Sequence, residues 1–218
     1  MIAPIEPEPR WHALIAVIAV AGLNLALPPR LIVGPRMVLP VVVGVLLVPL
    51  VAAGRSGRHR MNHAIGLTVN VVLTLAMIAS LALLVAALPA QEESGAELLI
   101  SAASLWLTNI LVFALWYWRL DAGGPNARDR RERHTGGAFL FPQMMTPAGF
   151  DPEAARWAPQ FIDYLFLAFN SSTAFSPTDT PVLTRWGKIL MIVQSLISLV
   201  ALALLAARAV NILGSAHG

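Results

Sequence analysis

The sequence predicts an all-α membrane protein with five transmembrane helices and one re-entrant segment, with six transmembrane helices as the alternative. Three observations lead to this class. Of 218 residues, 57% are hydrophobic and only 12% charged, and the mean hydropathy is +0.69. Long apolar runs alternate with short arginine-containing stretches. A soluble chain is about 45–50% apolar and about 25% charged, so this one lacks the polar surface to enclose its apolar residues in water.

Five apolar runs have the length that a membrane span requires. A hydrocarbon core about 30 Å thick needs roughly 17–25 residues of helix. The first run follows the acidic Glu6 and Glu8 and ends at Pro28 without a small-residue cleavage site, so we interpret it as a retained span and not a signal peptide. The last run exceeds the membrane thickness and must tilt or protrude. The predicted spans are Ala13 to Leu27, Met37 to Ala53, Ala64 to Leu88, Leu98 to Trp118 and Val182 to Leu213.

A polar linker, residues 119–158, separates the fourth and fifth runs. Its apolar island, Ala138 to Phe150, is too short and too proline-rich to span, so we expect it at the interface or folded under the helices. We interpret the linker's arginine cluster as a solvated loop, with contact to lipid headgroups or a partner as the alternatives. The cluster comprises Arg128, Arg130, Arg131 and Arg133.

The predicted re-entrant segment follows the linker. Its aromatic run, Gln160 to Phe169, is too short to span and leads directly into a polar tract. Non-helical backbone at membrane depth persists only where protein buries it or water reaches it, so this tract is the candidate functional site. Asp163 and Asp179 are functional candidates as carboxylates at membrane depth, and the alternative for Asp163 is that it caps a helix start at interfacial depth. The tract consists of Asn170, Ser171, Ser172, Thr173, Ala174, Phe175, Ser176, Pro177, Thr178 and Asp179.

The basic residues predict the orientation. Fourteen of the fifteen are arginine and Lys188 is the single lysine. The side that carries the amino terminus and the linker holds twelve of them, and the other side holds Arg30, Arg36 and Arg208. Positive loops face the cytoplasm, so we expect a multi-pass protein of the plasma (inner) membrane with a cytoplasmic amino terminus and linker.

Polar and small residues recur along one face of the last apolar run. Their spacing of four, three, four and three residues places them on one side of a helix. Two interpretations remain open: the face lines a central pathway that ends in a ring of arginines, or it is a seam through which helices pack closely. The residues are Gln194, Ser198, Ala201, Leu205 and Arg208.

The order of these features resembles the pore module of the potassium-channel superfamily. Phe161 to Phe166 is similar to its pore helix, and Thr173, Asp179 and Pro181 are similar to its filter threonine, filter aspartate and following proline. The resemblance implies an outer helix (98–118), a re-entrant helix and loop (159–181), an inner helix (182–213), a separate amino-terminal three-helix region (1–96) and a homotetramer. Phe175 and Pro177 stand near the places of the family's two filter glycines, so side chains would set selectivity.

The same stretch also resembles a family of bacterial integral membrane proteins of unknown function. The similar segments are Ser104 to Tyr117, Gly136 to Pro142, Asp163 to Phe169, Thr173 to Asp179 and Val210-Asn211. This resemblance implies a fold and no activity.

The sequence therefore predicts an ion-channel-like protein of pore-loop type with an unknown ion, a monovalent cation being favoured. A transporter or permease-like subunit and a non-conducting scaffold are the alternatives. The expected partners are the lipid bilayer, inorganic ions and further copies of the chain. We expect no enzyme activity, cofactor or nucleic-acid partner, and the His59 and His63 pair lacks a third ligand for a metal site.

Overall fold

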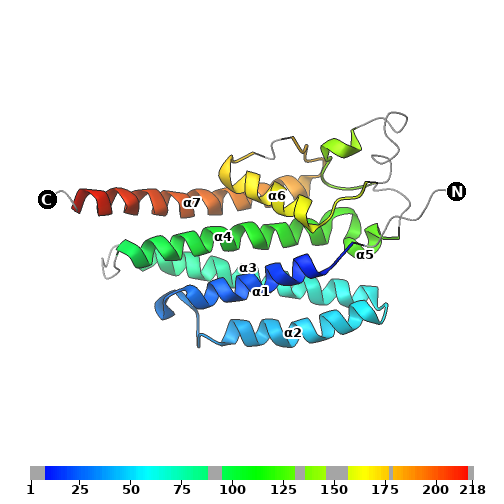
Figure 1. Ribbon diagram of the computed structural model, residues 1–218, viewed down its shortest axis with the longest axis horizontal. Coiled ribbons are helices and arrows are strands. Elements are labelled where there is room, and N and C mark those ends of the chain that lie inside the picture. The colour runs from blue at the N-terminus through cyan, green and yellow to red at the C-terminus, as the bar shows by residue number, and fades with distance from the viewer. Residues whose placement is uncertain (1–7, 88–94, 131–135, 146–156, 177–178, 216–218) are drawn as a thin grey trace.

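The computed structural model describes residues 8–87, 95–130, 136–145, 157–176 and 179–215, with the backbone alone for 95 and 208–215. These residues form helices joined by turns, together with one β-bridge between Phe139 and Val182, which confirms the prediction of an all-α chain (Figure 1). The helices are α1 (Trp11–Ala26), η1 (Pro29–Leu31), α2 (Val38–Arg55), α3 (His59–Ala87), α4 (Gly95–Leu120), η3 (Asp121–Gly123), α5 (Pro125–Arg128), η4 (Pro142–Met144), α6 (Phe161–Thr173) and α7 (Arg185–Ser215).

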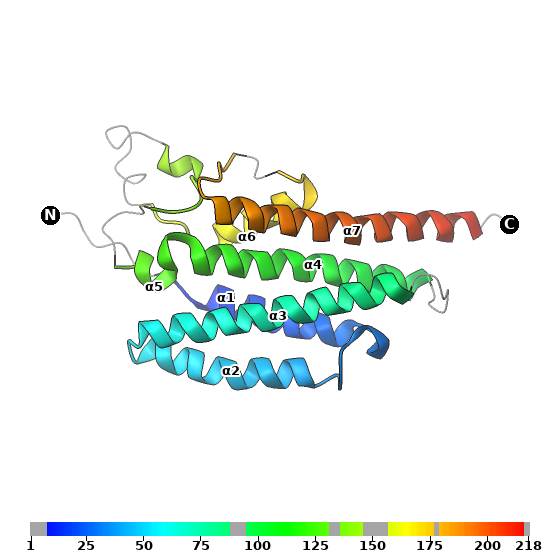
Figure 2. The ribbon, with the colours of Figure 1, turned by 180° about the vertical axis from the view of Figure 1, so that it is seen from behind.

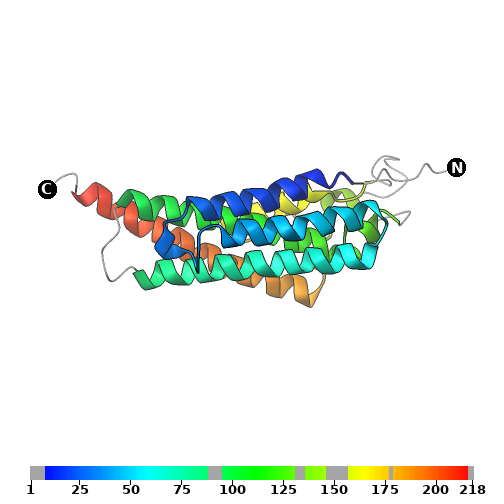
Figure 3. The ribbon, with the colours of Figure 1, turned by 90° about the horizontal axis from the view of Figure 1, so that it is seen from below.

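The long helices lie lengthwise in an elongated bundle with α4 at its centre (Figures 1 and 2). α4 packs against α1, α3, α6 and α7, whereas α2 packs on α3 and α1. The start of α1, the turn between α2 and α3, the end of α4 and the start of α7 lie at one end of the bundle, which we call the N-end. The view from below in Figure 3 shows α1, α2 and α3 side by side.

Four helices, α2, α3, α4 and α7, are long and apolar enough to cross a membrane. This finding indicates a membrane-embedded protein. It gives one span fewer than the five predicted from the sequence, because α1 has only 16 helical residues. At 1.5 Å per residue such a helix is about 24 Å long, shorter than a hydrocarbon core of about 30 Å.

The outer helices expose apolar surface while α4 is enclosed. In the apolar windows of these helices, 61% of the α4 residues are buried, against 17% in α2 and 22% in α7. Val45 on α2 and Ile192 on α7 are examples of exposed side chains. Outward apolar faces of this kind are expected of helices in contact with lipid or with another membrane subunit.

The described part of the linker folds back onto the bundle. Phe139 and Phe141 are buried, and their rings contact Tyr164 of α6. Of the two placements expected for the island from Ala138 to Phe150, its buried residues Phe139 and Phe141 have the one folded under the helices. Phe150 lies outside the described residues.

Candidate functional site

The site is built around α6, a helix of 13 residues that packs against α4 and α7 (Figures 1 and 2). It starts with a capping box, in which the Gln160 backbone N–H donates to Oδ2 of Asp163 at 2.8 Å and the Gln160 side chain caps the Asp163 backbone N–H. Capping satisfies donors that a helix start otherwise leaves unpaired. Asp163 therefore takes part in capping the start of α6, which is the alternative that the sequence offered for this residue.

Two buried carboxylates hold the first turn of α6 at the N-end of the bundle. The Tyr164 hydroxyl donates to Oδ2 of Asp121 at 2.6 Å, and Asp121 follows the last residue of α4. The backbone N–H of Phe161 donates to Oε1 of Glu8 at 2.7 Å. The start of α6 is therefore attached both to the end of α4 and to the segment that precedes α1.

The chain that follows α6 returns to the same place. Leu183, just before α7, donates its backbone N–H to the carbonyl of Ala138 at 2.7 Å, and Leu140 donates to the carbonyl of Pro181 at 3.0 Å. Ala138 in turn donates its N–H to Oδ1 of Asp121. Because Asp121 binds both Tyr164 and Ala138, and Ala138 binds Leu183, the segment from α6 to α7 begins and ends at the N-end of the bundle.

Buried charges surround this attachment. Glu8, 8% exposed, accepts hydrogen bonds from Nε1 of Trp118 (2.6 Å) and from Nη2 of Arg128 (3.1 Å). Arg128 also donates to the carbonyls of Trp118 and Asp121, at 2.7 and 3.0 Å. Arg128 is only 5% exposed, so its expected place in a solvated loop is wrong. It pairs with Glu8 and closes the last turn of α4, since charged groups remain buried where partners compensate them.

The predicted polar tract is partly helical. Asn170 to Thr173 form the last turn of α6, where the hydroxyls of Ser171 and Thr173 donate to the carbonyls of Leu167 and Phe169. Hydroxyl groups that bond back to the preceding turn are compatible with helix, so they do not interrupt α6. The non-helical part of the tract therefore begins at Ala174.

The side chains of the tract divide into two groups. Ser171 and Ser172 are buried, and Asn170 and Ser176 are half-buried. The exposed members are Thr173, Ala174, Phe175 and Asp179, while Pro177 and Thr178 lie outside the described residues. Phe175 has a φ of 53°, in the left-handed region that glycine adopts without strain.

The predicted face of α7 is packed against α4 and α6. Gln194, Ser198 and Ala201 are fully buried. The Gln194 amide donates to the carbonyl of Ala168 (2.7 Å) and to Oγ of Ser172 (2.8 Å), and its Oε1 accepts from the Tyr117 hydroxyl. These contacts have the character of the packing seam, the second of the two interpretations.

Asn109 of α4 extends the seam. Its Nδ2 donates to Oγ of Ser198 at 2.8 Å and to the backbone carbonyl of Gln194 at 3.1 Å. Leu205 is half-buried, and for Arg208 the structure describes the backbone alone. The seam therefore joins α4, α6 and α7 through side-chain hydrogen bonds, which are well suited to an apolar surrounding where water does not compete.

Comparison with models of protein families, with curated proteins and with solved structures finds no match to this chain. The side chains that α6 brings together are hydroxyls, carboxamides and carboxylates. Such groups line ion pathways and also bind polar solutes.

Five side chains of the site were absent from the sequence-based set. The sequence could have indicated Asn109 and Tyr117, because isolated hydrogen-bonding groups within an apolar helix need a partner. No local pattern in the sequence indicates Glu8, Asp121 or Tyr164, since their partners lie up to 153 positions away in the chain.

Proposed function

We propose that the chain is an ion-channel-like membrane protein of pore-loop type, in which α6 is a re-entrant helix and the tract from Thr173 to Asp179 forms the narrowest part of the pathway. The observation that carries the proposal is that both ends of the segment lie at Asp121: Tyr164 binds this carboxylate directly, and Leu183 binds Ala138, which itself binds Asp121. A short helix packed between two long helices, in a segment that begins and ends at one end of the bundle, resembles the pore helix of the potassium-channel superfamily.

The proposed membrane arrangement adds α1 as a fifth span to α2, α3, α4 and α7. Its 16 residues are short for a span, and local thinning of the bilayer accommodates such a mismatch at a modest cost. The arginine-rich N-end faces the cytoplasm of a bacterial inner membrane in this arrangement. Both ends of the re-entrant segment then lie at the cytoplasmic face.

The pathway requires several copies of the chain. One copy contributes one tract, and a single tract cannot enclose a pore. Thr173, Phe175 and Asp179 are exposed in the single chain, so they are accessible to a pathway or to neighbouring tracts. Four copies around a central axis follow from the resemblance to the potassium-channel module.

Side chains set the ion preference in this proposal. A ring of carboxylates from Asp179 favours cations, whereas a ring of arginines from Arg208 favours anions. Asp179 belongs to the tract and Arg208 lies more than five helical turns beyond the start of α7, so we assign the narrow part to Asp179 and favour a monovalent cation. Gln194 and Ser198 then position α6, and Leu205 and Arg208 remain candidates for the wall of the pathway.

Single-channel recording of the purified, oligomeric protein in planar bilayers tests the proposal. With potassium, sodium and chloride gradients exchanged in turn, we expect discrete openings whose reversal potential follows a cation gradient. Thr173→Trp should reduce the current by narrowing the tract, while Val45→Trp, on an exposed apolar face of α2, should leave it unchanged. Absence of current from folded, oligomeric protein would contradict the proposal and favour a transporter or a scaffold.

A further inference from the structure

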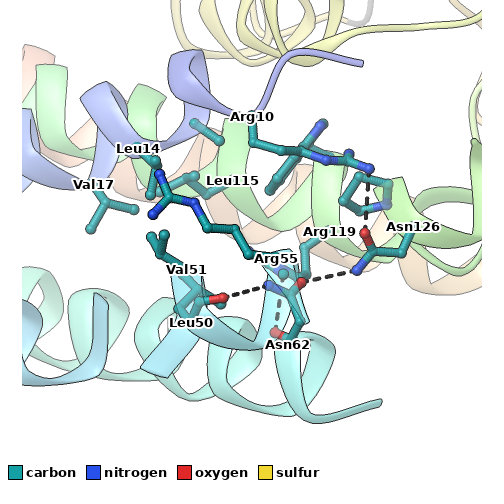
Figure 4. Close-up of a pocket in the computed structure, with 14 residues that line it drawn as sticks. Arg10, Leu14, Val17, Leu50, Val51, Arg55, Asn62, Leu115, Arg119 and Asn126 are labelled. Atoms are coloured by element: carbon teal, nitrogen blue, oxygen red, sulfur yellow. Dashed lines mark hydrogen bonds between the residues drawn. The ribbon is translucent and has the colours of Figure 1, made fainter. Parts of the chain in front are cut away.

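A pocket of about 360 Å³ lies at the N-end of the bundle between α1, α2, α4 and the start of α3, and no residue of α6 lines it (Figure 4). Its lining has two distinct parts. The part nearest the N-end is polar and cationic, with Arg10, Asn62, Arg119 and Asn126, whereas the side chain of Arg55 reaches from α2 to the side of Leu14 and Val17 (Figure 4). The part toward the middle of the bundle is apolar, with Ala13, Leu14, Val17, Leu50, Val51 and Leu115.

Arg119 is a buried cation in this pocket. It is 6% exposed, and its Nε has no hydrogen-bond partner among the described residues. Its Nη1 makes one long hydrogen bond, of 3.4 Å, to the carbonyl of Asn62. Within the described part of the chain, the charged side chains that act on it are Arg10 and Arg128, which are both cationic. A buried charge without a counter-charge is strongly unfavourable, so this position favours an anion.

The neighbouring arginines differ in how their charges are compensated. Arg10 forms ion pairs with Glu8 and Asp129. Within the described part of the chain, neither Arg55 nor Arg119 forms an ion pair, and the described lining of the pocket contains no carboxylate. Figure 4 shows the Arg55 side chain extending from α2 toward α1. Two arginines are therefore available to an anion that enters the pocket.

The fold holds the Arg119 guanidinium in place. It lies over the Trp118 ring, 4.9 Å from the centroid, and against the backbone of Gly66, where any larger residue would displace it. A chain of hydrogen bonds closes the polar end: Asn126 donates to Oδ1 of Asn62 at 3.0 Å, and Asn62 donates to the carbonyl of Leu50 at 2.9 Å (Figure 4). The guanidinium donors of Arg119 are thus preorganised for a ligand.

From this division of charge and apolar surface we propose that the pocket binds an anionic phospholipid. The phosphate of the headgroup binds Arg119 and Arg55, and an acyl chain follows Leu14, Val17 and Val51 toward the middle of the bundle. Basic pockets between membrane helices on the cytoplasmic side are suited to anionic headgroups. The apolar half distinguishes a lipid from a free phosphate, which needs no apolar wall.

Native mass spectrometry of the detergent-solubilised protein tests this proposal with three probes. Dioleoyl phosphatidylglycerol carries both the negative phosphate and the chains, dioleoyl phosphatidylcholine carries the same chains without net charge, and glycerol 3-phosphate carries the phosphate alone. We expect the phosphatidylglycerol to bind at least tenfold more tightly than either of the others. Equal binding of the two lipids would overturn the proposal. Glycerol 3-phosphate that binds as tightly as the phosphatidylglycerol would overturn it in favour of a free phosphate.

Substitutions locate the binding in the pocket. Because one basic residue near a membrane surface contributes about 1 kcal/mol, Arg55→Gln and Arg119→Gln should each weaken phosphatidylglycerol binding about fivefold. Neither should change phosphatidylcholine binding. Arg58→Gln removes the same charge from an exposed position at the same end, and it should have no effect.

Two further outcomes decide between the pocket and a general surface attraction. Equal losses in Arg55→Gln and Arg58→Gln would assign the effect to surface charge and overturn the proposal. Val51→Trp fills the apolar half without changing charge, and it should also weaken phosphatidylglycerol binding. If Arg119→Gln does not fold, the variants Arg55→Gln and Val51→Trp still test the proposal, because Arg55 is exposed and Val51 is half-buried.

Discussion

The hydroxyl of Tyr164, in the first turn of α6, donates a hydrogen bond of 2.6 Å to the carboxylate of Asp121, at the end of α4. The other oxygen of the same carboxylate accepts the backbone N–H of Ala138, and the carbonyl of Ala138 accepts the N–H of Leu183 just before α7. One buried carboxylate thus connects the start of α6 to the chain that returns from it.

Tyr164→Phe should destabilise the protein. The substitution removes a buried hydrogen bond to a charged acceptor, a type that contributes about 1.5–3 kcal/mol. Thermal unfolding in detergent, followed by tryptophan fluorescence, measures the change. Trp11→Phe, at a side chain that is 55% exposed, serves as a conservative aromatic control and should leave the melting temperature nearly unchanged. Equal melting temperatures of Tyr164→Phe and the parent protein would refute the importance of this contact.

Glu8→Gln should destabilise the protein more than Tyr164→Phe does. Removing one partner of a buried ion pair leaves the other charge uncompensated, which costs about 3–5 kcal/mol. The control is Glu97→Gln, which removes a carboxylate from an exposed pair with Arg30, where about 0–1 kcal/mol is expected. Chemical denaturation of both variants measures the difference. Similar losses in the two variants would show that Arg128 does not depend on Glu8.

Gln194→Leu should loosen α6. It removes the hydrogen bonds to Ala168, Ser172 and Tyr117 and should cost about 1–3 kcal/mol. Ser195→Ala, which loses one weak contact of 3.4 Å, is the matched control with little expected change. Faster proteolysis near α6 in Gln194→Leu alone would support the seam. No difference between the two variants would indicate that Gln194 does not hold α6.

Asp179→Asn should change ion selectivity and leave assembly intact. In the proposed pathway it removes a ring of negative charges, which lowers the preference for cations. The reversal potential under a potassium chloride gradient should move toward that of an unselective pore, while size-exclusion chromatography shows the same oligomer. Glu97→Gln, in the first turn of α4 at the end of the bundle opposite the N-end, should leave the reversal potential unchanged. An unchanged potential in Asp179→Asn would remove Asp179 from the pathway.

Much of the fold could be predicted because it depends on composition and length. Apolar runs of sufficient length appear as α2, α3, α4 and α7, and Asp163 stands at the start of α6. The extent of α6 could not be predicted in the same way. The serines and threonine at its end are typical of loops, but their hydroxyls bond back to the preceding turn and the helix continues to Thr173.

The partners of the buried polar residues could not be predicted from the sequence. The spacing of Gln194 and Ser198 predicted a shared face, but no local pattern tells whether that face meets water or another helix. The pairing of Glu8 with Arg128 joins residues 120 positions apart, so the sequence alone groups Arg128 with Arg130, Arg131 and Arg133. Such contacts are set by packing over the whole bundle, which a one-dimensional pattern does not contain.

The most direct test of the proposed re-entrant segment is cysteine labelling on both sides of it. The chain has no cysteine, so single substitutions at Gln143, before α6, and Lys188, after it, report without background. Both side chains are exposed. Val33→Cys, at an exposed site between α1 and α2 at the end opposite the N-end, is the control for the outer side.

We expect a membrane-impermeant maleimide to label Gln143→Cys and Lys188→Cys from the cytoplasmic side, and Val33→Cys from the outer side. Labelling of Lys188→Cys from the outer side, with Gln143→Cys labelled from the cytoplasm, would mean that the segment crosses the membrane completely. That result would contradict the re-entrant helix and the pore-loop proposal with it.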